Sequence, residues 1–273
     1  MNFAKYRIKA GSKVALKEQD PDDRSASAGS REEDQKRLEE LSRRLNQLQE
    51  LLYAERKHGM LVVLQGMDTA GKDGTIRQVF RMVDPLGVRV TSFKVPTEEE
   101  LAHDFLWRVH QRAPMRGEIV IFNRSHYEDV LVVRVHKWID EAECRRRYRQ
   151  INEFERWLAE QGLVVLKFFL HISKDEQKRR LQERLDQREK QWKFSVADLA
   201  ERKLWHEYMK ANEDALEATS SDWAPWYVVP ANSKLNRNLV VSSVLVDALE
   251  GLKMRYPAPK EKLEGIVIEL RVM

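Results

Sequence analysis

Short apolar runs alternate along the chain with longer stretches in which apolar residues recur every three or four positions. From Arg31 to about His58, leucines recur in this way with charged residues between them, which predicts an amphipathic helix. We expect its leucine face to pack on the rest of the domain, with a partner helix in an oligomer as the alternative. Five apolar runs further along predict strands, at Met60–Gln65, Val88–Lys94, Glu118–Phe122, Leu163–Ile172 and Trp226–Val229. Helical patterns lie between and after them, at about 73–83, 98–112, 141–161, 174–188, 196–218 and 235–254.

An alternation of strands and helices is typical of a parallel sheet with crossover helices. We therefore predict an α/β fold in which one domain, residues 31–256, contains a five-stranded parallel sheet flanked by helices. Residues 1–30 have few large apolar side chains, so we expect an irregular leader that is exposed from Gln19 to Ser30. Residues 257–273 are expected to form a C-terminal tail, whose apolar part either adds an edge strand or wraps around a neighbour.

Composition narrows the class of protein. Apolar residues make up 42% and charged residues 34% of the 273 positions, which suits a packed core but not a membrane span. Because the chain has neither an apolar run of about 18 residues nor a signal-peptide pattern, we expect a soluble cytoplasmic protein without a membrane partner. The single cysteine, Cys144, excludes an intramolecular disulfide framework and Cys-rich metal sites. The formal charge of +4 does not by itself identify a partner.

The first predicted strand leads into a candidate phosphate-binding loop. The sequence GMDTAGKDG at 66–74 fits the pattern G-x-x-x-x-G-K between a strand and a helix. Glycines allow successive N–H groups to face one anion, the helix adds its positive end, and Lys72 supplies a mobile cation. The expected phosphate or nucleotide contacts from this loop, besides Lys72, are Gly66, Met67, Thr69, Ala70, Gly71, Asp73 and Gly74.

Two carboxylates in this loop predict a metal ion. Asp73 stands where Ser or Thr would normally help to hold Mg²⁺, and Asp68 lies inside the loop. Carboxylates repel bound phosphate unless a cation lies between them, and oxygen ligands suit Mg²⁺, with Mn²⁺ as an alternative. In the other interpretation Asp73 only stabilises the helix N-terminus and Asp68 is a turn residue.

The third predicted strand ends in a second group of polar residues. Ligands of open α/β sheets bind at the carboxyl ends of strands, so this group is expected beside the phosphate loop. Arg124 is a candidate clamp for phosphate oxygens. Asn123 stands where an Asp usually ends this strand, and Glu128 would supply the missing charge. Alternatively, Asn123 is a helix cap and Glu128 a surface acid. Further on, Arg134 is a candidate phosphate ligand, whereas the run Arg145–Arg149 is more typical of a solvated helix face.

A basic segment follows the fourth predicted strand. Residues 178–193 contain seven basic and three acidic side chains, an excess equal to that of the whole chain. A basic helix and loop at this place resembles the lid of nucleotide kinases, which covers phosphates and excludes water. We therefore predict an arginine-rich helical lid at about 178–195, whose expected phosphate contacts are Arg179, Arg184, Arg188 and Lys193.

Several motifs together closely resemble the polyphosphate kinase 2 family, and more specifically its class III branch. They include GMDTAGKDG, FNRSHYEDVLVVRVH, FFLHISKDEQKRRLQERL, QWKFS and APWYVVPA, and the likeness runs from about Tyr6 to about Leu252. The resemblance implies a P-loop kinase fold similar to that of thymidylate kinase. It also implies Mg²⁺-dependent, reversible phosphoryl transfer between inorganic polyphosphate and nucleotides, with AMP and ADP as acceptors and ATP as product.

The resemblance also implies roles for particular residues. Asp68, Lys72 and Arg124 match the catalytic loop and strand-end residues of the family, and Arg134 with the lid arginines matches its phosphate contacts. In class III, Asn123 replaces the strand-end Asp and Glu128 accompanies that change. Lys193 and Asp198 match the end of the lid motif. Asp68, Glu128 and Asp73 are therefore our candidate metal ligands.

Two other functions remain open at this point. An ATP-dependent nucleoside monophosphate kinase would share the loop and the lid, and a non-catalytic nucleotide- or polyanion-binding regulator would need only the loop. Nucleic acid is not an expected partner, because the basic residues lack interleaved aromatic side chains and a recognition helix. A homo-oligomer, either a dimer or a dimer of dimers, is expected from the family resemblance and the amphipathic helix.

Overall fold

Five parallel strands form the centre of the computed structural model, which describes residues 3–266. Their order in the sheet is β2-β3-β1-β4-β5, and the strands are β1 (Gly59–Gln65), β2 (Val88–Ser92), β3 (Ile119–Asn123), β4 (Leu163–His171) and β5 (Trp226–Pro230). Met60 of β1 lies opposite Ile119 of β3 and Val164 of β4. Every residue of β1 is buried, as expected for the central strand of a sheet covered on both faces. The predicted five-stranded parallel sheet is confirmed.

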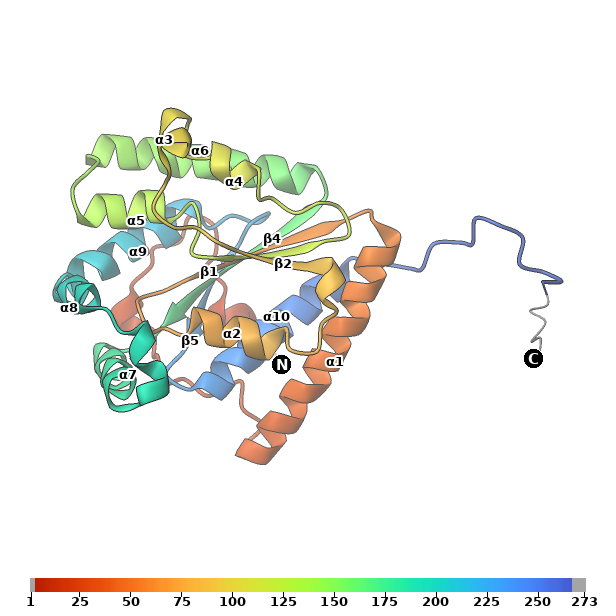
Figure 1. Ribbon diagram of the computed structural model, residues 1–273, viewed down its shortest axis with the longest axis horizontal. Helices are drawn as coiled ribbons and strands as arrows, with labels where there is room; N and C mark the ends of the chain where they lie inside the picture. Colours follow the sequence, from red (N-terminus) through yellow and green to blue (C-terminus); the bar gives the residue numbers. More distant parts are fainter. Residues whose placement is uncertain (1–2, 267–273) are drawn as a thin grey trace.

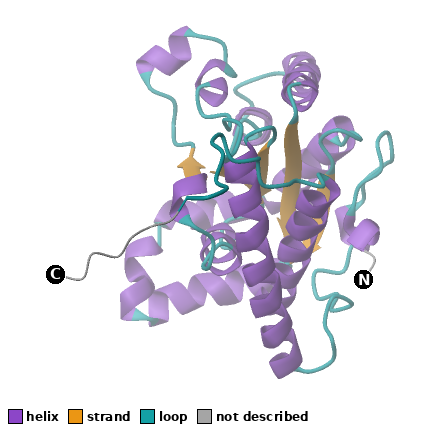
Figure 2. Ribbon diagram, turned by 90° about the vertical axis from the view of Figure 1, so that its right-hand side faces the viewer, coloured by secondary structure: helices purple, strands orange, loops and turns teal. Residues whose placement is uncertain are grey.

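Helices cover both faces of the sheet (Figures 1 and 2). On one face, α1 (Arg31–Glu55), α2 (Lys72–Val79) and α10 (Lys234–Gly251) pack against alternate residues of β1 such as Val62 and Leu64. On the other face, α5 (Glu128–Val135), α6 (Glu141–Glu160) and α9 (Trp205–Thr219) pack against Leu61 and Val63. The two hydrophobic clusters follow from the two-residue period of a strand.

The leucine face of α1 packs on α10, which confirms that it faces the domain in this chain. The helix begins with a capping box, in which the side chains of Ser30 and Glu33 each accept a hydrogen bond from the other residue's backbone N–H. Leu45, Leu48 and Leu52 are buried in the core.

Residues 3–30 run along the domain instead of standing apart from it. They include the short 3₁₀ helices η1 (Phe3–Tyr6) and η2 (Leu16–Glu18), and the side chains of Tyr6 and Leu16 are buried. The N–H of Ile8 donates to the carbonyl of Trp226 in β5. More than half of residues 19–30 are exposed, as their polar composition predicts, but Ala26 is buried in the core.

Some predicted helices are broken, because local capping competes with their apolar periodicity. The stretch 98–112 contains two short helices, α3 (Glu98–Ala102) and α4 (Trp107–His110). Between them His103 is extended, and Asp104 accepts a hydrogen bond from the backbone N–H of Leu106. The stretch 196–218 is likewise divided at Leu204 into α8 (Val196–Lys203) and α9. Helix α5 was not among the helices predicted from the sequence.

The lid segment contains α7 (Lys174–Asp186) followed by the 3₁₀ helix η4 (Arg188–Lys193). Another short 3₁₀ helix, η3 (Pro85–Gly87), precedes β2. After α10, residues 253–266 lead away from the domain without a helix or strand (Figure 1). The predicted edge strand of the tail falls largely on residues 267–273, which lie outside the described part of the chain. None of the helices within residues 3–266 has the length and apolar character that crossing a membrane requires.

Candidate phosphoryl-transfer site

The loop between β1 and α2 contains three residues with positive φ angles. Gly66 and Gly71 have φ angles of 150° and 104°, and Thr69 has a φ of 66°. These angles lie in the region that favours glycine. A Cβ at position 66 would lie 2.7 Å from the carbonyl oxygen of Leu170, so the close approach of β4 also requires glycine there. The loop therefore has the conformation and the helix N-terminus that the motif predicted.

Lys72, the first residue of α2, turns back over the loop. Its Nζ donates to the carbonyl oxygen of Gly66 at 2.7 Å. Burial lowers the pKa of Lys72 below its ordinary value, and the like charge of Arg124 lowers it further. The ammonium group lies where an anion in the loop would remove this electrostatic cost.

The end of β3 meets the phosphate loop, as the topology predicted. Arg124 has a φ of 62°, and its Nη2 donates to Oδ1 of Asp68 at 3.0 Å. Its Nη1 lies 3.8 Å from Oε2 of Glu128. Asn123 donates from Nδ2 to Oδ1 of Asp73 at 2.8 Å. Burial opposes the charged form of Arg124, but the carboxylates of Glu128 and Asp68 raise its pKa above the ordinary value.

The candidate metal ligands fit Mg²⁺ in their chemistry. Asp68 and Glu128 both contact Arg124, so the two carboxylates face the same place beside the loop. Among residues 3–266 no cluster of three or more His, Cys, Asp or Glu side chains forms a ready-made metal cage. Mg²⁺ usually takes one or two carboxylates together with phosphate oxygens and water, so this donor set suits an ion that is bound with a phosphorylated substrate. Asp73 is engaged by Asn123 and lies 3.9 Å from Lys193, which makes it the weaker candidate.

A cavity of about 820 Å³ lies above the loop. The segment from Glu183 to Asp198 forms one wall of it, which places η4 opposite α2. Arg184 pairs with Asp198 at 3.2 Å, and Lys193 approaches Asp73. The residues of the loop and the strand ends that line the cavity include Asp68, Thr69, Gly71, Lys72, Asp73, Gly74, Asn123 and Arg124. The structure thus brings Arg184 and Lys193 of the predicted lid to the phosphate loop.

Two other predicted lid contacts do not line this cavity in the described chain. Arg179 is exposed and forms ion pairs with Glu176 and Glu183 of its own helix. Arg188, at the beginning of η4, is also absent from the cavity wall. A helix presents successive residues about 100° apart, so only some basic residues of a run can face one cavity.

Arg134 lies elsewhere, on the last turn of α5. Its Nε donates to Glu141 at 2.9 Å and its Nη2 lies 2.8 Å from Asp214 of α9. These carboxylates raise its pKa, against the effect of burial. Arg134 therefore does not line the same cavity as Lys72 and Arg124 in this arrangement, because its carboxylate partners on two neighbouring helices hold the guanidinium there.

Sequence reasoning missed several basic residues of the cavity. Arg77 of α2 and Lys94 after β2 line it, as do Lys234 and Arg237 of α10. Arg237 is 2% exposed and lies between Asn236 and Asn238 in the first turns of α10. Its place in the first turns of a helix is the signal that could have identified it, since α10 follows a strand whose carboxyl end faces the site.

A buried polar network supports the segment that follows β3. Lys167 of β4 and Glu155 of α6 are fully buried and form an ion pair at 2.5 Å. Lys167 also donates to the hydroxyl of Tyr127, and Glu155 contacts Nε2 of His126 at 3.1 Å. His126 and Tyr127 lie in the chain between Arg124 and Glu128, so this network anchors the turn that carries both residues.

Comparison with known proteins agrees with this arrangement. Residues 28–257 match the family described as polyphosphate kinase 2. A protein of Meiothermus ruber named AMP/ADP-polyphosphate phosphotransferase is 59% identical over 265 residues, which cover 97% of this chain and 99% of the relative. An ADP-polyphosphate phosphotransferase of Rhodopseudomonas palustris is 47% identical over 84% of this chain and 83% of its own length.

A solved structure has the same fold. The crystal structure of polyphosphate kinase 2 from Arthrobacter aurescens superposes with a TM-score of 0.93 and 45% sequence identity, and covers 96% of this chain and 94% of that one. The sheet order, the loop after β1 and the helical segment after β4 are therefore parts of a shared architecture.

Proposed function

Because the chain belongs to the polyphosphate kinase 2 family, we propose that it transfers phosphoryl groups from inorganic polyphosphate to AMP and ADP. The observation that carries the proposal is the meeting of Lys72, Arg124 and Asp68 in one cavity, opposite Arg184 and Lys193. Such a cavity can bind several phosphate groups in a row. The relatives named above are phosphotransferases between polyphosphate and AMP or ADP, which supports the choice of substrates.

In the proposed reaction, an oxygen of the nucleotide's terminal phosphate attacks the end phosphorus of the polyphosphate. The bond from that phosphorus to the next bridging oxygen breaks, and the shortened chain leaves with the bonding electrons. The attacking oxygen is already anionic, so alignment and charge neutralisation matter more than a general base. Lys72 and Arg124 would stabilise the transferring group, and Arg184 and Lys193 would hold neighbouring phosphates.

Mg²⁺ belongs to the same proposal, with Mn²⁺ as a possible replacement. Asp68 and Glu128 would hold the ion, which when bound neutralises charge on phosphate oxygens. Burial raises the pKa of Glu128, while the positive charges of Arg124 and Lys72 oppose that rise. A cation beside Glu128 would favour its ionised form in the same way.

We also propose a cytoplasmic enzyme that forms a homo-oligomer, either a dimer or a dimer of dimers. Nucleic acid is not a proposed partner, because the basic residues around the phosphate loop line a cavity and not an open face. A phosphate chain enters such a cavity, whereas a duplex does not.

A matrix of donors and acceptors tests the proposal. Polyphosphate or ATP is offered with AMP, ADP or GDP, with and without Mg²⁺, and the products are separated by chromatography. We expect ADP and ATP from polyphosphate in the presence of Mg²⁺ only. Transfer from ATP to a monophosphate without any transfer from polyphosphate would instead identify a nucleoside monophosphate kinase. Tight nucleotide binding without turnover would identify a regulator.

A further inference from the structure

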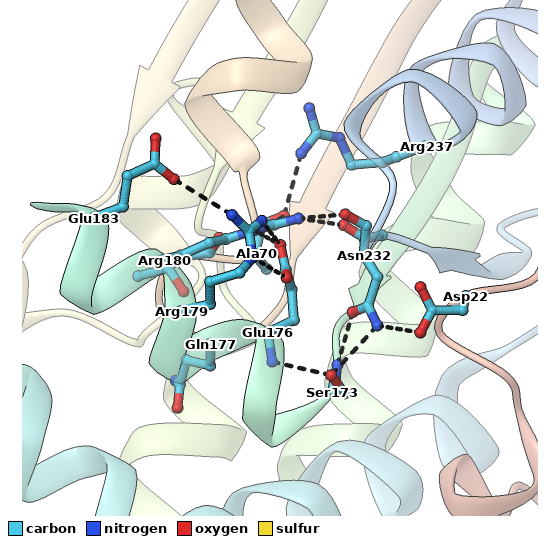
Figure 3. A network of polar contacts seen from close by, with 12 residues as sticks. Asp22, Ala70, Ser173, Glu176, Gln177, Arg179, Arg180, Glu183, Asn232 and Arg237 are labelled. Atoms are coloured by element: carbon cyan, nitrogen blue, oxygen red, sulfur yellow. Dashed lines mark hydrogen bonds and ion pairs between the residues drawn. The ribbon is translucent and has the colours of Figure 1, made fainter. Parts of the chain in front are cut away.

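A cluster behind the phosphate loop contains two buried arginines, Arg180 of α7 and Arg237 of α10 (Figure 3). Arg180 uses all five of its N–H donors within the protein. Nε donates to Glu176 at 2.6 Å, Nη1 to the carbonyls of Thr69 and Ala70 at 2.9 and 3.0 Å, and Nη2 to those of Ala231 and Asn232 at 2.6 and 3.0 Å. A guanidinium has five such donors, so none remains for a phosphate oxygen. Although Arg180 belongs to the lid helix, two of its hydrogen bonds go to the backbone of the phosphate loop and two to the backbone after β5.

Arg237 approaches the same loop from the other side. Its Nη1 donates to the carbonyl of Ala70 at 3.3 Å, while Nε and Nη2 donate to Oδ1 of Asn238. A Cβ at position 71 would lie 2.0 Å from Nη1 of Arg237, so glycine at this position leaves the room that the guanidinium occupies. Within residues 3–266 Arg237 forms no ion pair with a carboxylate, and burial with the like charge of Arg180 lowers its pKa to about 9.

Both arginines therefore donate to one carbonyl oxygen, that of Ala70. In a trans peptide the C=O and the next N–H point in opposite directions, and the described chain contains no cis peptide bond. Holding this carbonyl against the two guanidinium groups directs the N–H of Gly71 away from them. Gly71 lines the cavity, where its N–H would be available to a bound phosphate.

The cluster also joins three separate segments of the chain. Arg180 contacts the carbonyls of Ala231 and Asn232 after β5, and the side chain of Asn232 in turn contacts Ser173 before α7. Asn232 also donates to Asp22 of the leader. The phosphate loop, the base of α7 and the β5–α10 connection are thus held at one point, as Figure 3 shows.

We propose that Arg180 and Arg237 are positioning residues that hold the Ala70–Gly71 peptide in its anion-binding orientation and fix the lid helix to the phosphate loop. The inference rests on the proposed function, because it concerns the donor site of that reaction. Lys72 and Arg124 act on the phosphate directly. Arg180 and Arg237 also line the cavity, but their hydrogen bonds to the carbonyl of Ala70 act through the loop backbone. The two roles are separable by experiment.

The first experiment uses Arg237→Ala and Arg237→Lys, with Arg89→Ala as the matched control. Arg89 likewise contacts two backbone carbonyls and a carboxylate, those of Arg112, Ala113 and Glu118, but it lies at the other end of a strand, away from the loop. Steady-state rates with polyphosphate and ADP are measured together with the melting temperature. We expect Arg237→Ala to lose about 10²-fold in kcat with a smaller rise in KM, because the misdirected N–H acts mainly on the transferring group. Arg89→Ala is expected to lose at most about threefold in kcat at a similar fall in melting temperature.

Rescue distinguishes positioning from a general loss of structure. Guanidinium ion added at millimolar concentration is expected to restore about tenfold in the kcat of Arg237→Ala, since the truncated side chain leaves a buried place of its own shape. It is not expected to restore Lys72→Ala. The proposal would be overturned if the kcat of Arg237→Ala stayed within about threefold of wild type. It would also be overturned if Arg237→Ala and Arg89→Ala both lost kcat in proportion to their fall in melting temperature.

Arg180 is tested by Arg180→Lys, which keeps the charge but has only three donors for five acceptors. We expect weaker binding of inorganic tripolyphosphate, by about tenfold in calorimetry, although Arg180 itself has no donor free for phosphate. Unchanged binding would overturn its part of the proposal. If the wild type makes no ATP from polyphosphate, the proposed function fails, and the variants are compared with the donor that the wild type does use. The effect of Arg237→Ala on kcat with that donor then tests the positioning role separately.

Discussion

Two arginine-rich regions of the molecule have opposite electrostatic environments. Around α5 and α6, Arg134 pairs with Glu141 and Asp214, and Arg147 pairs with Glu143. Around the phosphate loop, Lys72 and Arg237 donate to backbone carbonyls or an amide instead. The pKa of Arg134 is consequently raised against the effect of burial, whereas burial and like charges lower the pKa values of Lys72 and Arg237.

The difference shows which basic residues can serve an anion. Arg134 is held by carboxylates of two neighbouring helices away from the cavity, so it gains little from a phosphate, because it would have to exchange partners. Arg124 also faces two carboxylates, but these are the candidate Mg²⁺ ligands beside the phosphate loop. A buried cation with only neutral acceptors, near other cations, gains a counter-charge when phosphate binds. Both regions contain basic residues, so their different uses depend on the acids around them.

The largest effect is expected from Lys72→Met, which removes a cation of the phosphate cavity and keeps the length of the side chain. We expect kcat for ATP formation from polyphosphate and ADP to fall by about 10²- to 10³-fold, as when one transition-state donor is lost. The melting temperature should stay the same or rise, because a buried charge is removed. Activity near that of the wild type would remove Lys72 from the proposed site.

Arg124 is expected to come next. Arg124→Met should lower kcat by about 10²-fold, and Arg124→Lys should recover only part of the loss, since lysine cannot bind two oxygens with a planar fork. Rates at several Mg²⁺ concentrations are measured for both variants. Since Arg124 contacts Asp68 and Glu128, the Mg²⁺ requirement should change as well. An unchanged Mg²⁺ requirement would separate Arg124 from the metal site.

Arg134→Met tests the other side of the comparison. We expect kcat and KM to stay within about threefold of wild type, while unfolding free energy falls by about 1 kcal/mol because Glu141 and Asp214 lose their partner. Urea unfolding and steady-state rates measure the two effects. If Arg134→Met loses activity as Arg124→Met does, the paired arginine does reach substrate, and the comparison of the two regions fails.

Much of the fold was predictable because the strands are buried on both faces. A continuous apolar run such as Met60–Gln65 has few alternatives when glycine-rich loops and helical patterns surround it. The phosphate loop combines a motif with the strand and helix that must flank it, so Lys72 could be placed beside Arg124 from the sequence alone. The break of 98–112 was not predictable, since it depends on Asp104 bonding to the backbone two residues later.

The partners of the arginines could not be predicted from the sequence. Asp214 is 80 positions beyond Arg134, and the two meet only because α5 packs on α9. Arg237 and Ala70 likewise meet only when α10 crosses behind the phosphate loop. Sequence patterns report the local amphipathic character of a helix, whereas the partner of a charge depends on which elements become neighbours. For this reason the residue types of the site were predictable and their division into two roles was not.

The smallest effect is expected at an exposed ion pair, which supplies a reference for both regions. Lys5, whose side chain is 43% exposed, pairs with Asp23 at 2.6 Å. Burial tends to raise the pKa of Asp23, but hydrogen bonds from Lys5 and Ser25 lower it to about 2. A carboxylate with a lowered pKa in the folded state stabilises the protein above its unfolded value of 3.8, and this contribution is lost as the pH falls through about 2.

Asp23→Asn should therefore be slightly less stable than the wild type at pH 6, by less than about 1 kcal/mol, because exposed pairs are screened by solvent. The difference in melting temperature between the two proteins should shrink as the pH falls from 6 toward 2. Catalytic rates should not change, since Asp23 does not line the phosphate cavity. A difference that stays constant with pH would mean that the carboxylate's charge is not what stabilises the leader. This charged pair would then contribute less to stability than the hydrogen bonds to neutral carbonyls that hold the buried cations of the phosphate loop.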